Sequence, residues 1–350
     1  MGEQNWMVYG ANGYTGELIA EVAHRRGLTP ILAGRREDAV KRVADRFGMK
    51  YRVFTLDDPA EVAKQFADVE AVLLAAGPFS KTSKPAVDAC IAAKTHYLDI
   101  TGEMAVFEAC HARDAEAKAA GVVLMPGVGF DVVPSDCLAL ALKEALPTAT
   151  SLELAFCGDG APSKGTAKTM LENIGAGGAI RKDGVITPVP TSWRTQEIPF
   201  RDRARTCVTI PWGDVSTAFY STGIPNIIVY TYMPARARRF TKVARPLLPL
   251  LGWNPIQRAL AKQIEKRVKG SDPQTRAAGR SQLWGRVTDD AGATAQGTLV
   301  TMEGYRLTAE ASVESTVRLL AGTRSGALTP SMGFGSRFIE SFEHSDLVIA

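Results

Sequence analysis

The first 125 residues alternate between short apolar runs and longer segments with the apolar spacing of amphipathic helices. The apolar runs are rich in β-branched residues and predict strands over residues 6–9, 30–33, 51–54, 71–75, 97–98 and 122–125. The intervening segments predict helices over residues 14–26, 37–47, 59–66, 83–93 and 104–119. This rhythm is typical of an α/β fold, in which a doubly wound parallel sheet is covered by helices on both faces.

The pattern changes after Gly127, where we expect a second domain of the α+β class. Residues 134–146 have helical periodicity, and SLELAFCG, which begins at Ser151, alternates like a half-buried strand. Further strands are predicted over residues 207–211, 225–233, 281–288 and 294–302, and they favour a mixed, mostly antiparallel sheet. The sequence from Asp289 to Gly292 predicts a hairpin turn between the last two strands.

Three glycines, Gly10, Gly13 and Gly16, follow the first predicted strand and open the first predicted helix. In a dinucleotide-binding βαβ unit, the first glycine permits a tight turn and the second lets backbone amides approach the pyrophosphate. The third lets the helix pack closely on the strand. The alternative is a purely structural turn, but the position after strand one favours cofactor binding. The intervening residues complete the predicted phosphate-binding turn: Ala11, Asn12, Tyr14 and Thr15.

Two arginines, Arg35 and Arg36, stand at the end of the second predicted strand. Enzymes that bind NAD usually carry an acidic residue there, which holds the ribose 2′-hydroxyl. A guanidinium group instead attracts the 2′-phosphate of NADP through charge-assisted hydrogen bonds, so the sequence favours NADP. The alternative is a solvated charge cluster that Glu37 and Asp38 neutralise.

The ends of the third and fourth predicted strands supply further candidates for cofactor binding. Asp57 is a candidate adenine contact, whereas Asp58, followed by a proline, is typical of a helix N-cap. After strand four, small residues leave room for the ribose and nicotinamide, and a proline and an aromatic residue follow as candidate walls of the pocket. These residues are Ala75, Ala76, Gly77, Pro78 and Phe79, although for Phe79 core packing is an equally good interpretation.

Composition excludes several classes of protein. The 350 residues are 45% hydrophobic and 22% charged, as in ordinary globular proteins, and the net charge of +4 makes nucleic acid an unexpected partner. Five cysteines without a C-x-x-C pair predict neither a disulfide framework nor a zinc site, and the four histidines show no metal-ligand spacing. The N-terminus lacks the features of a signal peptide, and no apolar run is long enough to span a membrane. We therefore expect a cytoplasmic protein.

Several ordered motifs resemble the saccharopine dehydrogenase family, in its short bacterial branch that includes the trans-acting enoyl reductases. In the first domain they are GANGYTG at 10–16, AGRR at 33–36, AAGPFS at 75–80, HYLDITGE at 96–103 and GVGFDVVPSD at 127–136. Later in the chain they are SKGTAKTMLE at 163–172, PWGDVSTAFYSTGIPNI at 211–227 and GALTPSMGFGSRFIES at 326–341. The resemblance thus covers nearly the whole chain.

The resemblance implies three parts of the chain with different roles. Residues 1–127 correspond to an NADP-binding Rossmann domain and residues 128–304 to a substrate and dimerisation domain on a mixed sheet. Residues 305–350, with a helix predicted over 305–320, correspond to a segment that returns to the Rossmann domain. A homodimer is implied by the resemblance alone. The second domain departs from that of the saccharopine reductases, so an α-amino-dicarboxylate substrate does not follow.

The catalytic candidates in the first half of the chain lie at the carboxyl ends of the last predicted strands, where a doubly wound fold binds ligands. Tyr97 and Asp99 end strand five and lead to Thr101, Gly102 and Glu103; they form part of the cleft or merely terminate the strand. A second candidate is Asp131, in the GVGFDVVPSD loop, as a proton relay or substrate anchor, with turn and cap chemistry as the alternative. Cys137 is the best-placed candidate for a nucleophile, although core packing is the more common role of such a cysteine.

In the second domain, polar and amphipathic residues in motifs that we expect to be loops are candidates for substrate contact. They are Lys164, Thr166, Trp212, Asp214 and Tyr220, of which Lys164 and Tyr220 are also catalytic candidates. None of the eight tyrosines has a lysine four residues later, which excludes the Tyr-x-x-x-Lys pair of short-chain dehydrogenases.

Residues 236–269 are strongly basic around an apolar centre and contain one acidic residue, Glu265. They predict either a basic amphipathic helical pair packed on the second domain, or a peripheral contact with an anionic membrane or a lipid substrate.

Together the motifs predict an NADPH-dependent reductase that transfers hydride to a C=N or C=C bond of a small or lipid-like metabolite at the interdomain cleft. The alternatives are a non-catalytic NADP(H)-binding sensor or scaffold, and a membrane-surface interaction protein.

Overall fold

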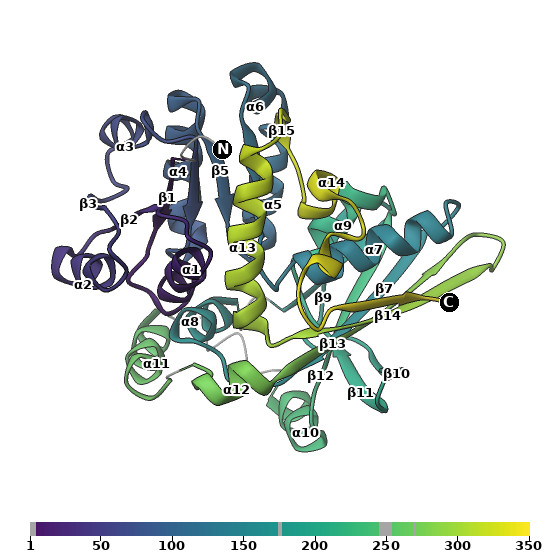
Figure 1. Cartoon of the computed structure of the whole chain (residues 1–350). Helices are drawn as coiled ribbons and strands as arrows, with labels where there is room; N and C mark the ends of the chain where they lie inside the picture. Colours follow the sequence, from purple (N-terminus) through teal and green to yellow (C-terminus); the bar gives the residue numbers. More distant parts are fainter. Residues whose placement is uncertain (1–4, 174–176, 245–253, 269) are drawn as a thin grey trace. The chain divides into compact units, whose positions relative to one another are not determined.

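The fold was analysed in a computed structural model, which describes residues 5–173, 177–244, 254–268 and 270–350 (Figure 1). Contacts between Cα atoms divide the chain into two compact units. The first unit contains the residues up to Val133 together with Tyr305–Gly335, and the second contains Pro134–Gly304 together with Ser336–Ala350.

The first unit is built on a seven-stranded sheet with the strand order β15-β6-β5-β4-β1-β2-β3, in which every neighbouring pair is parallel. Six of these strands keep the 3-2-1-4-5-6 order of a dinucleotide-binding fold. Their bounds are β1 (Trp6–Tyr9), β2 (Ile31–Gly34), β3 (Tyr51–Val53), β4 (Ala71–Leu74), β5 (His96–Asp99), β6 (Val123–Met125) and β15 (Gly326–Ala327).

Helices cover both faces of this sheet because alternate strand residues point to opposite sides. On β1, Trp6 and Val8 join a core that includes residues of α1, α2 and α13, whereas Met7 and Tyr9 join a core with α3, α4, α5 and α6. The helices are α1 (Tyr14–Arg25), α2 (Glu37–Phe47), α3 (Pro59–Phe66), α4 (Phe79–Ala93), α5 (Met104–His111), α6 (Asp114–Ala120), α13 (Gly304–Leu320) and α14 (Pro330–Phe334).

The second unit is built on a nine-stranded mixed sheet that runs β10-β11-β12-β7-β13-β14-β16, with β8 and β9 joined to β12. Among the described strands of this second sheet, β7 and β12 are the only parallel pair. The bounds are β7 (Ser151–Gly158), β8 (Gly178–Lys182), β9 (Val185–Val189), β10 (Thr195–Pro199), β11 (Ala204–Thr209), β12 (Asn226–Tyr232), β13 (Arg280–Thr288), β14 (Thr294–Met302) and β16 (Asp346–Ile349). The predicted fold class, a doubly wound sheet followed by a mixed and mostly antiparallel one, is confirmed.

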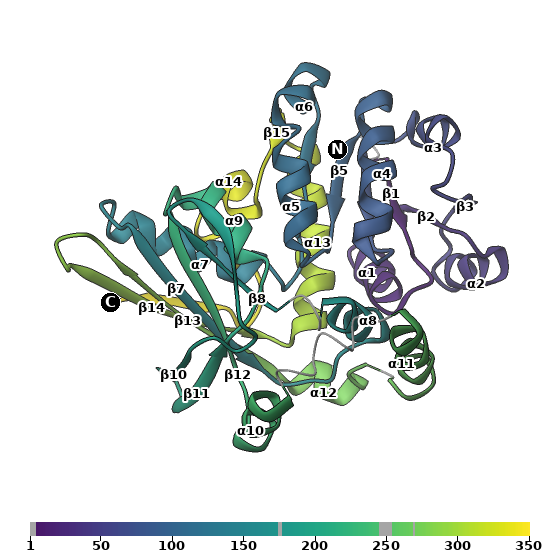
Figure 2. The same ribbon diagram turned by 180° about the vertical axis from the view of Figure 1, so that it is seen from behind.

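Several helices pack on or beside the second sheet (Figure 2). α7 lies over β13 and β14, where a β-carbon on Gly285 would come within 2.6 Å of Leu142 and one on Gly297 within 3.0 Å of Leu138. The helices of the second unit are α7 (Val133–Ala145), α8 (Lys164–Asn173), α9 (Asp214–Thr222), α10 (Ala235–Ala244), α11 (Asn254–Arg267) and α12 (Pro273–Ala278), with a 3₁₀ turn, η2 (Phe338–Ser341), near the C-terminus. Of these, α8 and α11 pack against each other.

Some elements differ from the sequence prediction. α4 begins four residues before the predicted start at 83, and the single helix predicted over 104–119 is two helices, separated at Ala112 and Arg113. The chain after residue 335 belongs to the second unit, because β16 pairs antiparallel with β14. The predicted segment 305–350 is therefore divided between the two units.

The basic segment 236–269 contains two helices, α10 and α11, one on each side of its apolar centre. Its centre, residues 245–253, and residue 269 lie outside the described part of the chain.

Candidate active site

The three glycines form a tight turn between β1 and α1, and each has its own steric reason. Gly10 has φ +92°, and a β-carbon there would lie 2.8 Å from Ala75 and Ala76 at the end of β4. A β-carbon on Gly16 would overlap the Gly10 carbonyl oxygen and lie 2.8 Å from Ala11 Cα. At Gly13, by contrast, the only neighbour of an added β-carbon within 4 Å is that same oxygen, at 3.3 Å. Gly10 and Gly16 are therefore packed against the protein backbone, whereas Gly13 has open space beside it.

The start of α1 is suited to bind an anion. Gly13 is the N-cap and has no side chain to accept hydrogen bonds from the first amides of the helix. Those N–H groups and the positive end of the helix dipole favour a phosphate. Asn12 lies against Gly34, and the Tyr14 ring packs edge-on against Tyr305 at 5.0 Å between centroids. Of the remaining turn residues, Ala11 is buried and Thr15 is half-buried. The turn fits the pyrophosphate of a dinucleotide.

Arg35 and Arg36 follow β2 and are exposed. Within the described residues, neither forms an ion pair with Glu37 or Asp38, which occupy the first turn of α2. Acidic residues at that position are stabilised by the helix dipole, so they do not need the arginines as partners. Both guanidinium groups are available for a phosphate.

The carboxylates after β3 have different environments. Asp58 caps α3 and accepts hydrogen bonds from the amides of Ala60 at 3.0 Å and Glu61 at 3.4 Å. Asp57 is exposed, and its charge acts on Tyr9 at the end of β1. Burial raises the pKa of Tyr9 to about 12, against a lowering effect of Arg35 and with a smaller raising effect of Asp57. Arg35 and Asp57 therefore lie near the same end of β1.

The segment after β4 is held by a carboxylate from another loop. Glu103 accepts hydrogen bonds from the amides of Phe79 at 3.0 Å and Ser80 at 2.8 Å, and so caps the start of α4. Phe79 and Ala76 pack, partly buried, against the core around β1 and β4, whereas Gly77 is exposed and Pro78 is half-buried. The segment that we predict beside the nicotinamide is thus held by Glu103, in the loop that follows β5. The sequence analysis did not identify Glu103 as this cap.

Asp99, at the end of β5, joins three segments. Its Oδ1 accepts hydrogen bonds from the amides of Thr101 at 2.9 Å and Gly127 at 2.8 Å, and its Oδ2 accepts the Tyr97 hydroxyl at 2.6 Å. The Thr101 hydroxyl in turn accepts the amide of Glu103 at 3.0 Å. Burial raises the pKa of Asp99 to about 6, although the three hydrogen bonds lower it. Tyr97 is fully buried, so its hydroxyl donates a hydrogen bond to Asp99 and does not reach solvent.

Asp131 lies against Gly102, where an added β-carbon would be 2.6 Å from its Oδ2. Burial raises the pKa of Asp131 to about 7. The loop that carries it is tied to α13 by the hydrogen bond from the Phe130 amide to the Thr308 hydroxyl, 3.0 Å long. Asp131 is therefore a fixed carboxyl group that is partly protonated at neutral pH, as a proton donor requires.

Residues 6–125 match the family model for the saccharopine dehydrogenase NADP-binding domain. Most of the first unit thus matches a known cofactor-binding domain. Residues 6–125 are a saccharopine dehydrogenase NADP-binding domain. The predicted resemblance and the predicted cofactor are confirmed at this level.

The chain is also similar to proteins named as reductases or oxidoreductases. A trans-acting enoyl reductase of Mycobacterium bovis is 32% identical over 138 residues, which cover 37% of this chain and 33% of the relative. A saccharopine dehydrogenase-like oxidoreductase of Mus musculus is 26% identical over 213 residues, 53% of this chain and 50% of the relative. The matched region thus spans half or less of these relatives' length.

The fold of the whole chain is shared with the apo form of saccharopine dehydrogenase (L-Glu forming) from Saccharomyces cerevisiae. The TM-score is 0.67 at 13% identity, and the match covers 99% of this chain and 100% of the yeast chain. At that identity the likeness shows the fold alone.

The candidates in the second unit lie mostly on helices, so the prediction that they lie in loops is wrong for all but Trp212. Lys164 and Thr166 are on α8, and Asp214 and Tyr220 are on α9. Lys164 is exposed, whereas Asp214 is fully buried. Thr166 shares a hydrogen bond with Ser163 at 3.1 Å, and the Trp212 ring lies 4.7 Å from that of Phe156. Lys164 and Tyr220, which is half-buried, retain solvent-accessible surface for a substrate.

Cys137 is fully buried in α7, and burial raises its thiol pKa well above the usual value. A buried, protonated thiol is a poor nucleophile, so the core-packing interpretation fits it better.

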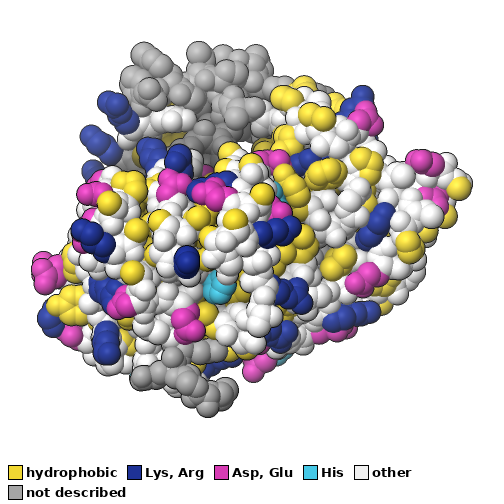
Figure 3. All heavy atoms as spheres, turned by 90° about the horizontal axis from the view of Figure 1, so that it is seen from above, with side chains coloured by type: hydrophobic (Ala, Val, Ile, Leu, Met, Phe, Trp, Pro, Cys, Tyr) yellow, Lys and Arg dark blue, Asp and Glu magenta, His cyan; other side chains and the backbone are white. Residues whose placement is uncertain are grey.

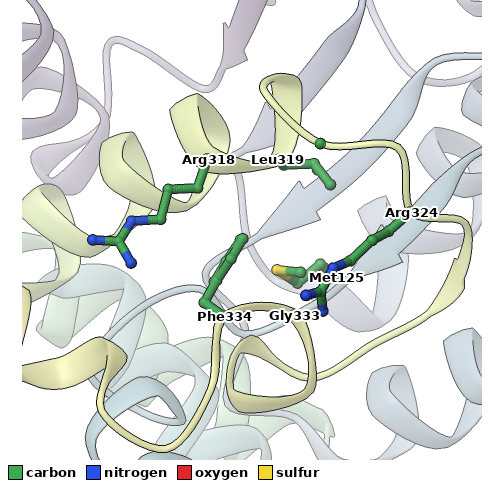
Figure 4. Close-up of a pocket in the computed structure, with 7 residues that line it drawn as sticks. Met125, Arg318, Leu319, Arg324, Gly333 and Phe334 are labelled. Carbon is green, nitrogen blue, oxygen red and sulfur yellow. The ribbon is translucent and has the colours of Figure 1, made fainter.

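One cavity of about 210 Å³ lies in the first unit between the end of α13 and α14 (Figure 4). Its arginines already have protein partners: Arg318 pairs with Glu314 at 2.6 Å, and Arg324 donates to the Met332 carbonyl oxygen at 2.6 Å. In Figure 4 the Arg318 guanidinium extends away from Met125. This cavity is therefore a poor site for a phosphate group.

Side chains of both charges are interspersed on the face drawn in Figure 3. Among the residues described, no helix has the length and apolar character needed to cross a bilayer. In the same part of the chain, no three His, Cys, Asp or Glu side chains gather as metal ligands do.

Proposed function

We propose that this chain is an NADPH-dependent reductase that transfers hydride to a C=N or C=C bond of a small or lipid-like metabolite. The observation that carries the proposal is the NADP-binding domain in which Arg35 and Arg36 stand exposed, without acidic partners, at the end of β2. Their guanidinium groups favour a 2′-phosphate, and cells use NADPH mainly to reduce substrates.

The residues of the first unit would hold the cofactor at both ends. The amides of Gly13 and the first turn of α1 bind the pyrophosphate, and Arg35 and Arg36 bind the 2′-phosphate. The segment Ala76–Phe79, fixed by Glu103, borders the nicotinamide. When bound, NADPH supplies the hydride.

Asp131 would supply the proton that completes the reduction. With hydride delivered to the imine carbon or to the β-carbon of an enoyl group, the carboxylic acid of Asp131 would protonate the imine nitrogen or the enoyl α-carbon. A pKa of about 7 suits this role, because the acid form is populated at neutral pH and the carboxylate is reprotonated from solvent. Tyr97 and Asp99 act as positioning residues, since Asp99 binds the amides of Thr101 and Gly127 and Asp131 lies against the neighbouring Gly102.

The relatives' names support both bond types, one as an enoyl reductase and another as a saccharopine dehydrogenase-like oxidoreductase. We therefore propose to separate the two by direct assay. Purified protein and NADPH would be mixed with enoyl thioesters of increasing chain length, or with imines formed from amino acids and aldehydes, and NADPH oxidation followed by absorbance.

A reductase oxidises NADPH with one of these substrate sets, and Asp131→Asn lowers that rate without weakening NADPH binding. A second candidate function is a non-catalytic NADP(H)-binding sensor, which the burial of Tyr97 and the lack of a Tyr-x-x-x-Lys pair favour. NADPH binding without oxidation by either substrate set would favour the sensor. No NADPH binding at all would contradict both.

A further inference from the structure

A polar pocket lies in the second unit, beside the first residues of β11, where the pairing of β11 with β12 ends. β12 pairs with β11 only along Cys207–Thr209, so the first residues of β11 have no strand on that side. The chain turns there into α10, and a cavity of about 360 Å³ opens between β11 and the start of α10. β11, β12 and α10 lie together in both Figure 1 and Figure 2. The pocket is lined by Arg203, Ala204, Arg205, Thr206, Tyr232, Ala235 and Arg238.

The lining carries three positive charges and no negative one. Asp202 pairs with Arg205 at the edge of the pocket, and Glu197 stands opposite Thr206 on β10 without lining it. Between Asp214 and Glu265 the sequence contains no acidic residue, so α10 adds cations alone. Asp202 neutralises Arg205, whereas Arg203 and Arg238 form no ion pair among the described residues, so their guanidinium groups attract an anionic ligand.

The arginines are partly preorganised. Asp202 holds the Arg205 guanidinium through two hydrogen bonds of 2.6 and 2.8 Å. Arg238 donates through Nη1 to the Met233 carbonyl oxygen at 2.9 Å, which leaves its other N–H groups for a ligand. Arg203 is exposed and, among the described residues, has no ion-pair partner. Side chains already fixed by protein partners lose less conformational entropy when a ligand binds.

We propose that this pocket binds the phosphate group of a phosphate-bearing ligand. Several forked guanidinium donors, the Thr206 hydroxyl and the start of α10 match a tetrahedral group with three or more acceptor oxygens better than a flat carboxylate with two. The Tyr232 side chain is 42% exposed and offers an aromatic face beside that group. The ligand is either a small phosphorylated metabolite or the headgroup of an anionic phospholipid, which present the same chemistry. The site goes beyond the proposed reductase, because all its residues belong to the second unit.

The test measures binding of radiolabelled inorganic phosphate by equilibrium dialysis, with saturating NADPH present to fill the nucleotide site. Sedimentation with phosphatidylglycerol vesicles, and with phosphatidylcholine vesicles as the uncharged comparison, distinguishes a lipid headgroup from a free phosphate. The variants are Arg203→Gln/Arg238→Gln, and Arg203→Gln alone in case the double variant fails to fold. The matched control is Lys182→Gln, which removes an exposed positive charge of the same unit outside the pocket.

We expect wild-type protein to bind phosphate, phosphatidylglycerol vesicles or both. The double variant should weaken that binding by about tenfold or more, and Arg203→Gln by a smaller factor, since each lost charge-assisted hydrogen bond is worth about that much. Lys182→Gln should bind as wild type does. The proposal is overturned if wild-type protein binds neither probe, if the arginine variants bind as tightly as wild type, or if Lys182→Gln loses as much binding.

Discussion

At the scale of single residues, Gly13 and Gly16 have opposite relations to their surroundings. A β-carbon on Gly16 would collide with backbone atoms of Gly10 and Ala11, whereas one on Gly13 would have a single neighbour at 3.3 Å. Gly16 serves packing inside the protein, and Gly13 keeps surface open for the cofactor.

Gly16→Ala should therefore destabilise the protein by about 1–3 kcal/mol, the usual cost of overpacking, because α1 must shift away from the turn. Gly13→Ala should cost less, about 0.5–1 kcal/mol, the usual difference between glycine and alanine at an N-cap, yet weaken NADPH binding. Denaturant unfolding and calorimetric titration of both variants separate the two effects. Equal loss of stability in both variants would contradict this division of roles.

Asp131 predicts a pH dependence with a definite sign. Its pKa is raised by burial from 3.8 to about 7, so the folded protein holds a proton that the unfolded chain releases near pH 4. This contribution to stability is present below pH 4 and is lost as the pH rises through about 7. Asp131→Asn, which cannot ionise, should flatten that part of the stability profile.

Reductase activity should fall above pH 7 for the same reason, since the acid form of Asp131 disappears. Asp131→Asn should lower kcat by about a hundredfold or more and remove this limb of the pH–rate profile. A profile that is unchanged in Asp131→Asn would contradict the assignment of Asp131 as proton donor.

At the scale of elements, α4 depends on a cap that comes from another loop. Glu103 accepts the amides of Phe79 and Ser80, which no side chain within α4 caps. Glu103→Ala should lower the free energy of unfolding by about 1 kcal/mol, as the loss of an N-cap usually does, and weaken NADPH binding.

The matched control is Glu116→Ala, which removes an exposed carboxylate paired with Arg113 on α6. Exposed ion pairs contribute little, so we expect a clearly smaller loss of stability than in Glu103→Ala and unaltered NADPH affinity. Denaturant unfolding compares the two variants, and equal effects would show that Glu103 is not a cap.

The elements that sequence reasoning predicts well are those whose signals are local. The strands β1 and β14 and the helices α2 and α3 have the predicted bounds, because periodicity and capping residues lie within each element. No local signal marks the break between α5 and α6, where Arg113 pairs with Asp88 of α4 and Glu116 of α6. The hairpin of β8 and β9 was missed although Asp183 and Gly184, both at positive φ, form the Asp-Gly turn that signals one.

In the candidate site, too, the sequence predicts residues whose signals are local and does not predict roles that depend on distant contacts. The glycine turn and Arg35 follow from residues adjacent to one strand, so the sequence predicts them directly. The role of Glu103 does not follow, because its partners in α4 lie more than twenty positions away. The sequence marks Asp99 as the end of a strand. The hydrogen bond that it accepts from the Gly127 amide depends on β5 and β6 being neighbours in the sheet, which no local pattern shows.

At the scale of the whole molecule, each unit combines distant parts of the chain. Residues 305–335 complete the first unit through α13 and β15, and residues 336–350 complete the second through β16. The sequence pattern predicts the helix over 305–320, but where each part of the C-terminal segment belongs depends on strand pairing across long sequence separations.

Hydrogen exchange measures cofactor binding across the whole molecule. Saturating NADPH should slow exchange of the amides over residues 10–17 and 34–36, since these segments form the predicted phosphate contacts. Mass spectrometry of peptides with and without NADPH checks this. Protection that leaves both segments unchanged would contradict the predicted cofactor site.

The most direct test of the account compares NADPH and NADH by isothermal titration calorimetry, with wild-type protein and Arg35→Ala. We expect wild-type protein to prefer NADPH, and Arg35→Ala to lose about ten- to a hundredfold in affinity for NADPH while NADH affinity changes little. Lys182→Ala serves as a control for the loss of one positive charge. Equal losses for both nucleotides, or no heat from either with wild-type protein, would contradict the central claim that Arg35 binds the 2′-phosphate of NADP.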